Sequence, residues 1–108
     1  MDLPSEACMM RIFTSERARG NHRALFEDIV RKARDEGLAG ATVLRGPMGF
    51  GASSRIHNAN ILDLSSNLPL VIEIVDSEAK LRAFLNSIED LKDVGLVTME
   101  KVQVLHPG

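Results

Sequence analysis

Alternating hydrophobic positions mark four strand-like segments along the chain. In the first, both alternating sets of side chains are largely apolar, and in the third only Glu73 is polar, which is typical of strands with little exposure on either face. In the last, the apolar phase shifts from odd to even positions, so we expect a bulge or bend near Glu100 and Lys101. The predicted strands are Cys8 to Thr14, Ala41 to Leu44, Leu70 to Val75 and Leu96 to Leu105.

Two segments between these strands carry the helical period instead. The first helix is predicted from about His22 to Glu36, with Asn21 as its N-cap and Gly37 in the C-cap position. Its apolar stripe consists of Leu25, Phe26, Ile29, Val30 and Ala33.

The second helix is predicted to begin after the capping residues Asp76 and Ser77 and to end at Gly95. Its buried stripe is expected to be Leu81, Phe84, Leu85, Ile88 and Leu91. The order of elements is then β-α-β-β-α-β. Right-handed crossovers would place both helices on one face of a four-stranded antiparallel sheet, so the predicted fold is α+β and ferredoxin-like, with a long loop between strands two and three.

The face of this sheet that the helices leave free needs cover. The strands lack the alternation of apolar and polar residues that a sheet with one wet face shows. A chain of 108 residues forms a single domain, residues 1–108, and has no third layer to supply. We therefore expect the open face to pack against copies of the chain; the alternative is a monomer with a mildly apolar surface.

Composition and charge narrow the classes of function. The net charge is -2, so the basic footprint of a nucleic-acid binder is absent. Cys8 is the only cysteine, which fits a reducing compartment, and we expect it to be a small buried strand residue. The first residues show no signal-peptide pattern, and the longest apolar stretch, residues 68–75, is far shorter than the ~20 residues of a membrane helix. These features predict a cytoplasmic protein without direct membrane insertion.

The segment from Arg45 to Asn67 carries the candidate chemistry. It is far longer than a hairpin loop of about 2–5 residues, and part of it could extend the hairpin as strand. Its glycines let backbone N–H groups approach an anion, its serines and arginines add donors, and its histidine can donate or accept a hydrogen bond. The residues concerned are Arg45, Gly46, Gly49, Gly51, Ser53, Ser54, Arg55 and His57. They fit an anion-binding loop; the alternative is a solvated loop that binds no ligand.

Catalysis and metal binding have little support. Ser53, Ser54 and His57 are close in sequence, but the pattern Gly-x-Ser-x-Gly of an activated nucleophile is absent, and spacing alone supplies no orienting acid. No histidine pair has metal-ligand spacing, and one cysteine cannot build a zinc site. We therefore expect no catalytic residue and no metal site.

Several motifs resemble the PII-like family known as domain of unknown function 190. The likeness extends from about Met10 to Leu105. Its motifs are Gly40 to Gly46, Gly49-Phe50-Gly51, Ser53 to His57 and Leu68 to Asp76. The resemblance implies a homotrimer whose sheets line an inner core, with nucleotides bound in clefts between subunits. By matching position it adds Thr42 and Phe50 to the ligand-binding candidates, beside Gly49 and Gly51.

The chain departs from true PII proteins in two places. The spacing from Thr42 to Gly49 is one residue longer, with Pro47 inside it. Where PII proteins carry a glycine-rich phosphate-binding loop with a lysine, residues 88–96 contain a single glycine and several acids. The resemblance therefore leaves a smaller adenine nucleotide, another anion or no ligand as alternatives to ATP.

Three hypotheses for function follow. The first is a trimeric sensor that binds a small anionic effector and regulates a partner such as a membrane transporter or channel. The second is an effector-independent interaction subunit of an ion-transport protein, because family members similar to this chain are often linked with such proteins, including fluoride exporters. The third is an enzyme that uses the serine, histidine and arginine residues of the loop. We expect the first and expect no enzymatic activity.

Overall fold

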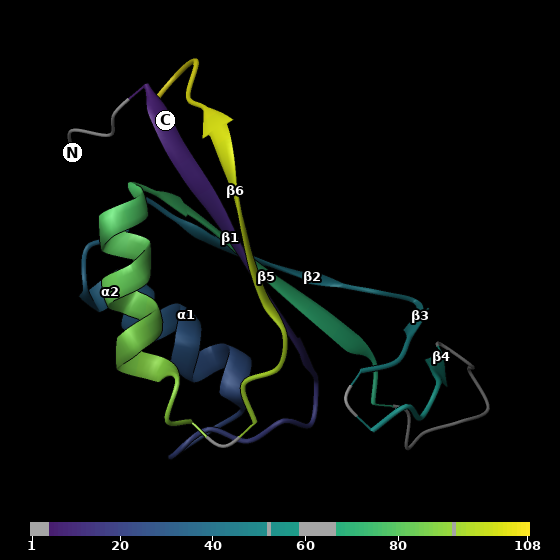
Figure 1. Cartoon of the computed structure of the whole chain (residues 1–108). Coiled ribbons are helices and arrows are strands. Elements are labelled where there is room, and N and C mark those ends of the chain that lie inside the picture. Colours follow the sequence, from purple (N-terminus) through teal and green to yellow (C-terminus); the bar gives the residue numbers. More distant parts are fainter. Residues whose placement is uncertain (1–4, 52, 59–66, 92) are drawn as a thin grey trace.

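The computed structural model describes residues 5–51, 53–58, 67–91 and 93–108, which form two helices and six strands (Figure 1). Four long strands build one sheet, and two short strands pair separately in a small ribbon. In chain order the elements are β1 (Glu6–Ser15), α1 (Leu25–Asp35), β2 (Ala41–Arg45), β3 (Met48–Gly49), β4 (His57–Asn58), β5 (Pro69–Asp76), α2 (Glu78–Ile88) and β6 (Val97–Gln103).

The main sheet has the strand order β2-β5-β1-β6, and all neighbouring strands run antiparallel. β1 lies in its interior, where Met10 pairs with Ile74 of β5 on one side and with Met99 of β6 on the other. The connection from β1 to β2 contains α1, and the connection from β5 to β6 contains α2. The predicted α+β, ferredoxin-like fold with its four-stranded antiparallel sheet is confirmed.

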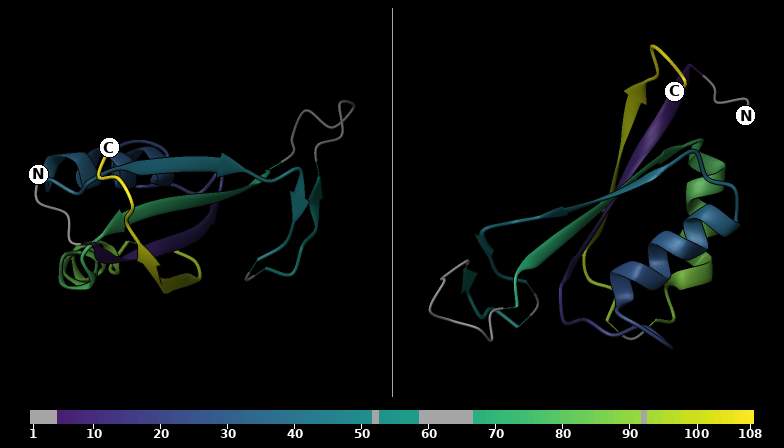
Figure 2. Two further views of the ribbon diagram at one scale, coloured as in Figure 1. Left: turned by 90° about the horizontal axis from the view of Figure 1, so that it is seen from above. Right: turned by 180° about the vertical axis from the view of Figure 1, so that it is seen from behind.

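Both helices cover one face of the main sheet (Figure 2). The side chains of β1 that face them, Cys8, Met10 and Ile12, are at most 5% exposed, which confirms the expected burial of the cysteine. The helices contribute the inner parts of both predicted stripes, because an amphipathic helix must bury its apolar side against another layer. The core consists of Cys8, Met10, Ile12, Leu25, Ile29, Ala33, Leu38, Ile72, Ile74, Leu81, Phe84 and Ile88.

The start of α1 differs from the predicted one. The helix begins at Leu25, so the predicted start at His22 and the predicted N-cap Asn21 were wrong. The residues before the helix are used differently, because Arg19 and Ala24 form an antiparallel bridge that closes this segment into a tight loop. Ala24 is the residue before the first turn, and its side chain makes no capping bond.

The second helix starts as predicted and ends earlier. The hydroxyl of Ser77 accepts a hydrogen bond from the Lys80 N–H at 3.3 Å, which is the expected N-cap contact. α2 ends at Ile88, so the predicted end at Gly95 was wrong. The first helix does stop as predicted, because Gly37 follows it with φ +76°, a left-handed conformation that favours glycine.

The last strand contains no bulge. The pairing of β6 with β1 is continuous from Val97 to Gln103, so the bulge expected near Glu100 and Lys101 was wrong. The apolar residues shift from odd to even positions because those at the start of the strand lie on the helix side of the sheet and those at its end lie on the opposite side. Val97 packs against the core beneath the helices, whereas Lys101 faces an open pocket beside α2, and Val102 then lies on the opposite face.

Candidate functional site

The loop between β2 and β5 forms a small ribbon that projects from one end of the main sheet (Figure 1). Its two strands pair Met48 with Asn58 and Gly49 with His57. The prediction that part of the long loop forms strand is therefore confirmed, although this ribbon is separate from the main sheet. Predictions that fall on Ala52 and on residues 59–66 lie outside the described residues.

Two glycines of the motif are needed where the ribbon leaves the sheet. The N–H of Gly46 donates to the carbonyl of Pro69 at 2.9 Å. A Cβ atom on Gly46 or on Gly49 would lie 3.1 Å from Cγ of the same proline ring, closer than most real contacts. Both glycines therefore let the ribbon pass over Pro69, which explains their place in the motif without a ligand.

A pocket of about 860 Å³ lies between the ribbon and the end of the main sheet. Its size falls within the range of small-molecule sites. Two phenylalanines contribute apolar surface from opposite sides, Phe13 from β1 and Phe50 from the loop. Its walls also contain Thr14, Ser15, Arg17, Ala18, Gly49, Gly51, Ser53, His57, Asn67, Pro69, Leu70, Asp93, Gly95 and Leu96.

The structure brings half of the predicted ligand-binding residues to this pocket. Gly49, Phe50, Gly51, Ser53 and His57 line it together. They converge because β3 and β4 pair beside each other and the chain turns between them, with the Ser54 N–H donating to the Gly51 carbonyl at 2.9 Å. These residues supply an aromatic face, a hydroxyl and an imidazole to one cavity.

The other predicted residues lie elsewhere in the monomer. Thr42 is exposed on β2, opposite Glu73. Arg45 pairs with Glu16, with 3.1 Å between Nη2 and Oε2, so its charge is already met within the chain. Ser54, at φ 61°, and Arg55 lie in the exposed turn, and none of these side chains lines the pocket. Their ligand-binding role stays a prediction, as does that of Gly46.

The wall opposite the ribbon was not anticipated from the sequence. It comes from the end of β1 and from the loop that follows, and Arg17 supplies its positive charge. The Arg17 N–H donates to the side-chain oxygen of Asn67 at 2.8 Å, which holds this loop beside the start of β5. The hydroxyl of Thr14 is buried and has no hydrogen-bond partner among the described residues, so it is an unsatisfied polar group beside the pocket.

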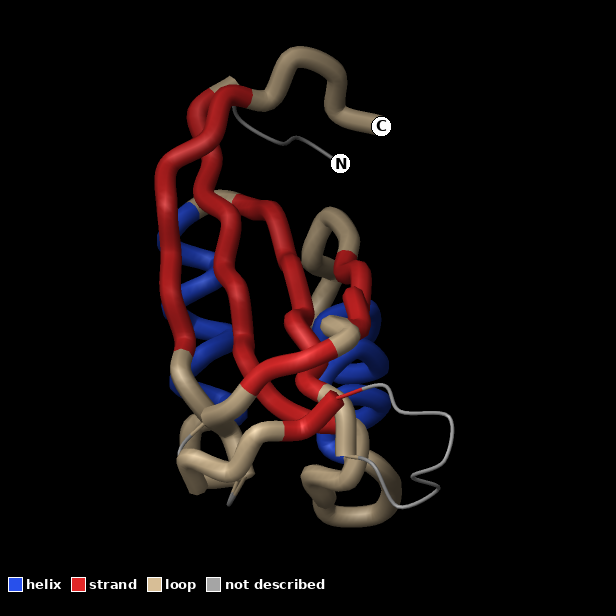
Figure 3. Tube along the Cα trace, turned by 90° about the vertical axis from the view of Figure 1, so that its right-hand side faces the viewer, coloured by secondary structure: helices blue, strands red, loops and turns tan. Residues whose placement is uncertain are grey.

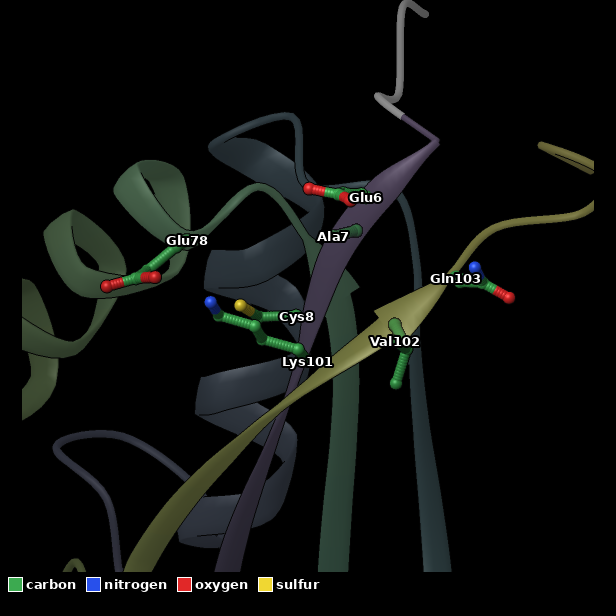
Figure 4. A pocket seen from close by; sticks show the side chains of 7 residues that line it. All are labelled: Glu6, Ala7, Cys8, Glu78, Lys101, Val102 and Gln103. Carbon is green, nitrogen blue, oxygen red and sulfur yellow. The ribbon is translucent and has the colours of Figure 1, made fainter.

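A second pocket, of about 400 Å³, lies at the opposite end of β1 (Figure 4). Cys8 and Lys101 point into it side by side, from paired positions on β1 and β6, and both face Glu78 at the first turn of α2. The hydrogen bond from Arg82, at 2.8 Å, lowers the pKa of the Glu78 carboxyl below its ordinary value, and the charge of Arg82 adds to this effect. The acid is therefore ionised at neutral pH.

The thiol at this second pocket is expected to react slowly in the folded protein. Cys8 is 5% exposed, so a reagent such as 5,5′-dithiobis(2-nitrobenzoate) must wait for local opening before it reaches the sulfur. We expect modification at neutral pH to be at least ten times slower than in guanidinium chloride, as followed by absorbance. Equal rates in the two conditions would contradict the burial of this side chain.

The described residues contain neither a metal-binding cluster of side chains nor a helix that could cross a membrane. No group of three histidine, cysteine, aspartate or glutamate side chains lies close enough to hold a metal ion. Across the same residues, neither helix has the length and apolar character needed to cross a membrane.

Solved structures that share this fold are of the PII-like class. CPII from Thiomonas intermedia K12, solved with ADP and bicarbonate, matches with a TM-score of 0.62 and 16% identity, over 94% of this chain and 91% of that chain. A protein named as a putative PII-like signaling protein from Thermus thermophilus matches with a TM-score of 0.64 and 18% identity, over 96% and 93%. The fold is thus PII-like.

Sequence comparison gives the family. The family model of domain of unknown function 190 (DUF190, "Uncharacterized ACR") matches residues 7–104. A UPF0166 protein of Aquifex aeolicus (strain VF5) is 38% identical over 98 residues, 91% of this chain and 92% of that protein. A UPF0166 protein of Methanocaldococcus jannaschii is 30% identical over 100 residues, 92% of each. The chain belongs to the DUF190 family, as its motifs predicted.

Proposed function

We propose that this chain is a PII-like regulatory protein that binds a small anionic effector and passes the signal to a partner through its ribbon. The observation that carries the proposal is the 860 Å³ pocket, which joins the glycine-phenylalanine-glycine motif of the ribbon to the end of β1. Effector contacts there would fix the position of the ribbon relative to the sheet, and ordering of a segment by a ligand is a known kind of switch. The proposal assigns the chain no catalytic step.

The chemistry of the pocket favours an effector with one flat apolar group and a low negative charge. Phe13 and Phe50 offer rings on which a base can stack, a contact worth about 1–3 kcal/mol per base. Among the described lining residues, Arg17 brings a positive charge, and Asp93 opposes it with a negative one. An adenine nucleotide with one or two phosphates fits this balance better than ATP, and the ADP and bicarbonate of CPII make these the first ligands to test.

The proposal also includes assembly and location. We place the protein in the cytoplasm, as a homotrimer held together by its helix-free sheet faces, with a membrane transporter or channel as the regulated partner. An apolar side chain outside the pocket supports self-association through those faces, since Leu44 of β2 is 48% exposed. Light scattering at micromolar concentration that returned the mass of one chain would contradict this part of the proposal.

Effector binding is tested by isothermal titration calorimetry with AMP, ADP, ATP and cyclic AMP, each with and without bicarbonate. We expect AMP or ADP to bind more tightly than ATP. Arg17→Met should weaken that binding at least tenfold, because a charge-assisted hydrogen bond to a phosphate is worth about 1.5–3 kcal/mol. Phe50→Ala should weaken it by a similar factor through lost stacking.

The matched control for this titration is Arg34→Met. Arg34 lies on α1, pairs with Asp35 and has a side chain that is 71% exposed, so its loss should leave the affinity unchanged. No heat with any ligand, or equal affinities for Arg17→Met and Arg34→Met, would contradict effector binding at this pocket.

The exposed surface of the ribbon favours the effector-independent interaction subunit as the second candidate. Met48, Phe50 and Ile56 are 60%, 69% and 58% exposed on a projecting element, which suits contact with another protein. In a reconstituted complex with a candidate ion-transport protein, replacing all three by serine should abolish co-purification. Retained co-purification would exclude the ribbon as the contact, and lost co-purification together with silent calorimetry would favour this candidate over the sensor.

A further inference from the structure

One residue, Glu16, joins the loop after β1 to both ends of the chain segment that carries the ribbon. This loop and the ribbon lie at the same end of the main sheet (Figure 3). Oε2 of Glu16 lies 3.1 Å from Nη2 of Arg45, the last residue of β2. Its other carboxylate oxygen, Oε1, accepts a hydrogen bond at 3.2 Å from the N–H of Leu68, directly before β5. We call these two contacts the Glu16 bridge.

The carboxylate of the Glu16 bridge is partly shielded from water. A fully exposed ion pair contributes little, because water and salt screen it. The Glu16 side chain, however, is only 28% exposed, and Leu68 is 7% exposed. The backbone adds a further bond, in which the Glu16 N–H donates to the Leu68 carbonyl at 3.0 Å. Removing the carboxylate would therefore leave a shielded backbone donor without its acceptor, which costs more than the loss of a surface contact.

The Glu16 bridge lies directly beside the pocket of about 860 Å³. Ser15 and Arg17, the two neighbours of Glu16 in the chain, both line this pocket, whereas Glu16 does not. The facing wall comes from the ribbon, which follows Arg45 in the chain and includes Phe50. The separation of the two walls therefore depends on how the ends of the ribbon segment are held, and the bridge contacts each of these ends.

We propose that Glu16 is a positioning residue that keeps the ribbon over the pocket, so that an effector meets a site that is already formed. This inference rests on the proposed function and names the contact that prepares its pocket. A pocket that must first close loses affinity in proportion to the fraction of molecules in which it is open. By holding Arg45 and Leu68, Glu16 keeps this open fraction low before the effector arrives. Glu16 makes no contact with the effector and acts only through the position of the ribbon.

Limited digestion with trypsin tests this role without any ligand. Arg55 lies in the exposed turn of the ribbon, and cleavage after it becomes faster when the ribbon opens more often. Glu16→Gln keeps an acceptor for the Leu68 N–H but removes the charge that pairs with Arg45, so we expect cleavage to be about threefold faster or more. Glu16→Ala removes both contacts and should speed cleavage about tenfold or more, as followed by mass spectrometry. Unchanged rates in both variants would overturn the inference.

The partner residue and the effector give two further measurements. Arg45→Gln should speed cleavage as much as Glu16→Gln, and the double variant should be no faster than either single variant, because all three lack the same ion pair. Effects that add would overturn the pairing. At saturating ADP, cleavage of Glu16→Gln should fall to the rate of the ligand-bound wild type, because the variant keeps every described residue that lines the pocket. Cleavage that stays fast with ADP bound would overturn the positioning role.

Two controls separate this role from a general loss of stability. Glu27→Gln removes a carboxylate that pairs with Arg23 and Arg31 at α1, so it should leave cleavage after Arg55 unchanged. Cleavage after Arg82, within α2, reports unfolding of the whole domain, and an equal acceleration at both sites in the Glu16 variants would overturn the positioning role. A wild type that binds no ligand in calorimetry contradicts the effector of the proposed function, whereas a wild type that binds, with Glu16 variants cleaved at its rate, contradicts only the role of Glu16.

Discussion

Gly95→Ala is expected to lower the free energy of unfolding by about 3 kcal/mol. A Cβ atom at this position would overlap the carbonyl oxygen of Phe13, and this oxygen belongs to the backbone of the interior strand β1 and cannot move aside cheaply. Any shift also strains the adjacent hydrogen bond, in which the Phe13 N–H donates to the Leu96 carbonyl at 2.8 Å. In thermal unfolding, the loss should appear as a fall in Tm of roughly 10 to 20 °C.

Two other glycines serve as controls for this substitution. Gly40 has open space where a Cβ would go, so Gly40→Ala should change the free energy of unfolding by no more than about 0.5 kcal/mol. At Gly20 the added atom would meet only the side chain of Asp28, which can rotate away, so an intermediate loss is expected. If Gly95→Ala and Gly40→Ala unfold at the same temperature, the close approach between residue 95 and β1 is not a constraint on the fold.

The strands were predictable because burial on the helix side fixes their pattern. The predicted Leu70 to Val75 became Pro69–Asp76, in which every second residue, from Leu70 onward, is buried. Helix ends were less predictable because local capping signals compete with contacts that are distant in sequence. The glycine at position 95 looks like a helix terminator, yet it is needed for a close contact with Phe13, on the first strand of the chain.

One wall of the candidate site could be predicted and the other could not, again because contacts between distant parts of the chain leave no local pattern. The loop motif Gly49-Phe50-Gly51 is contiguous, so its residues could be identified from the sequence and do line the pocket. The facing wall is built by long-range contacts, such as the bond from the Arg17 N–H to Asn67, that leave no pattern along the chain. A signal for this wall was the polar run after the first strand, which contains Arg17, Arg19 and Arg23.

Asp76→Ala is expected to cost about as much stability as the glycine substitution, by removing acceptors instead of adding bulk. Asp76 is 3% exposed at the end of β5. Its carboxylate accepts hydrogen bonds from the Ala39 N–H at 3.0 Å and the Ser77 N–H at 2.7 Å, and lies 3.7 Å from Nζ of Lys80. It therefore ties the loop before β2 to the first turn of α2. Alanine would leave two backbone donors without these partners, at a cost of about 3 kcal/mol.

The asparagine variant at the same position separates lost bonds from lost volume. Asp76→Asn keeps the shape of the side chain and one acceptor oxygen. Its amide N–H₂ group replaces the other carboxylate oxygen, so two hydrogen-bond donors, this group and a backbone N–H, then face each other. We expect it to lose roughly 1 to 2 kcal/mol in urea unfolding, between the wild type and Asp76→Ala. Asp35→Ala, at a side chain 67% exposed on α1, should lose less than about 0.5 kcal/mol. Equal losses for Asp76→Ala and Asp35→Ala would show that this buried carboxylate does not hold the two segments together. The losses should differ because the hydrogen bonds of Asp76 are shielded from water, whereas the Asp35 side chain is exposed.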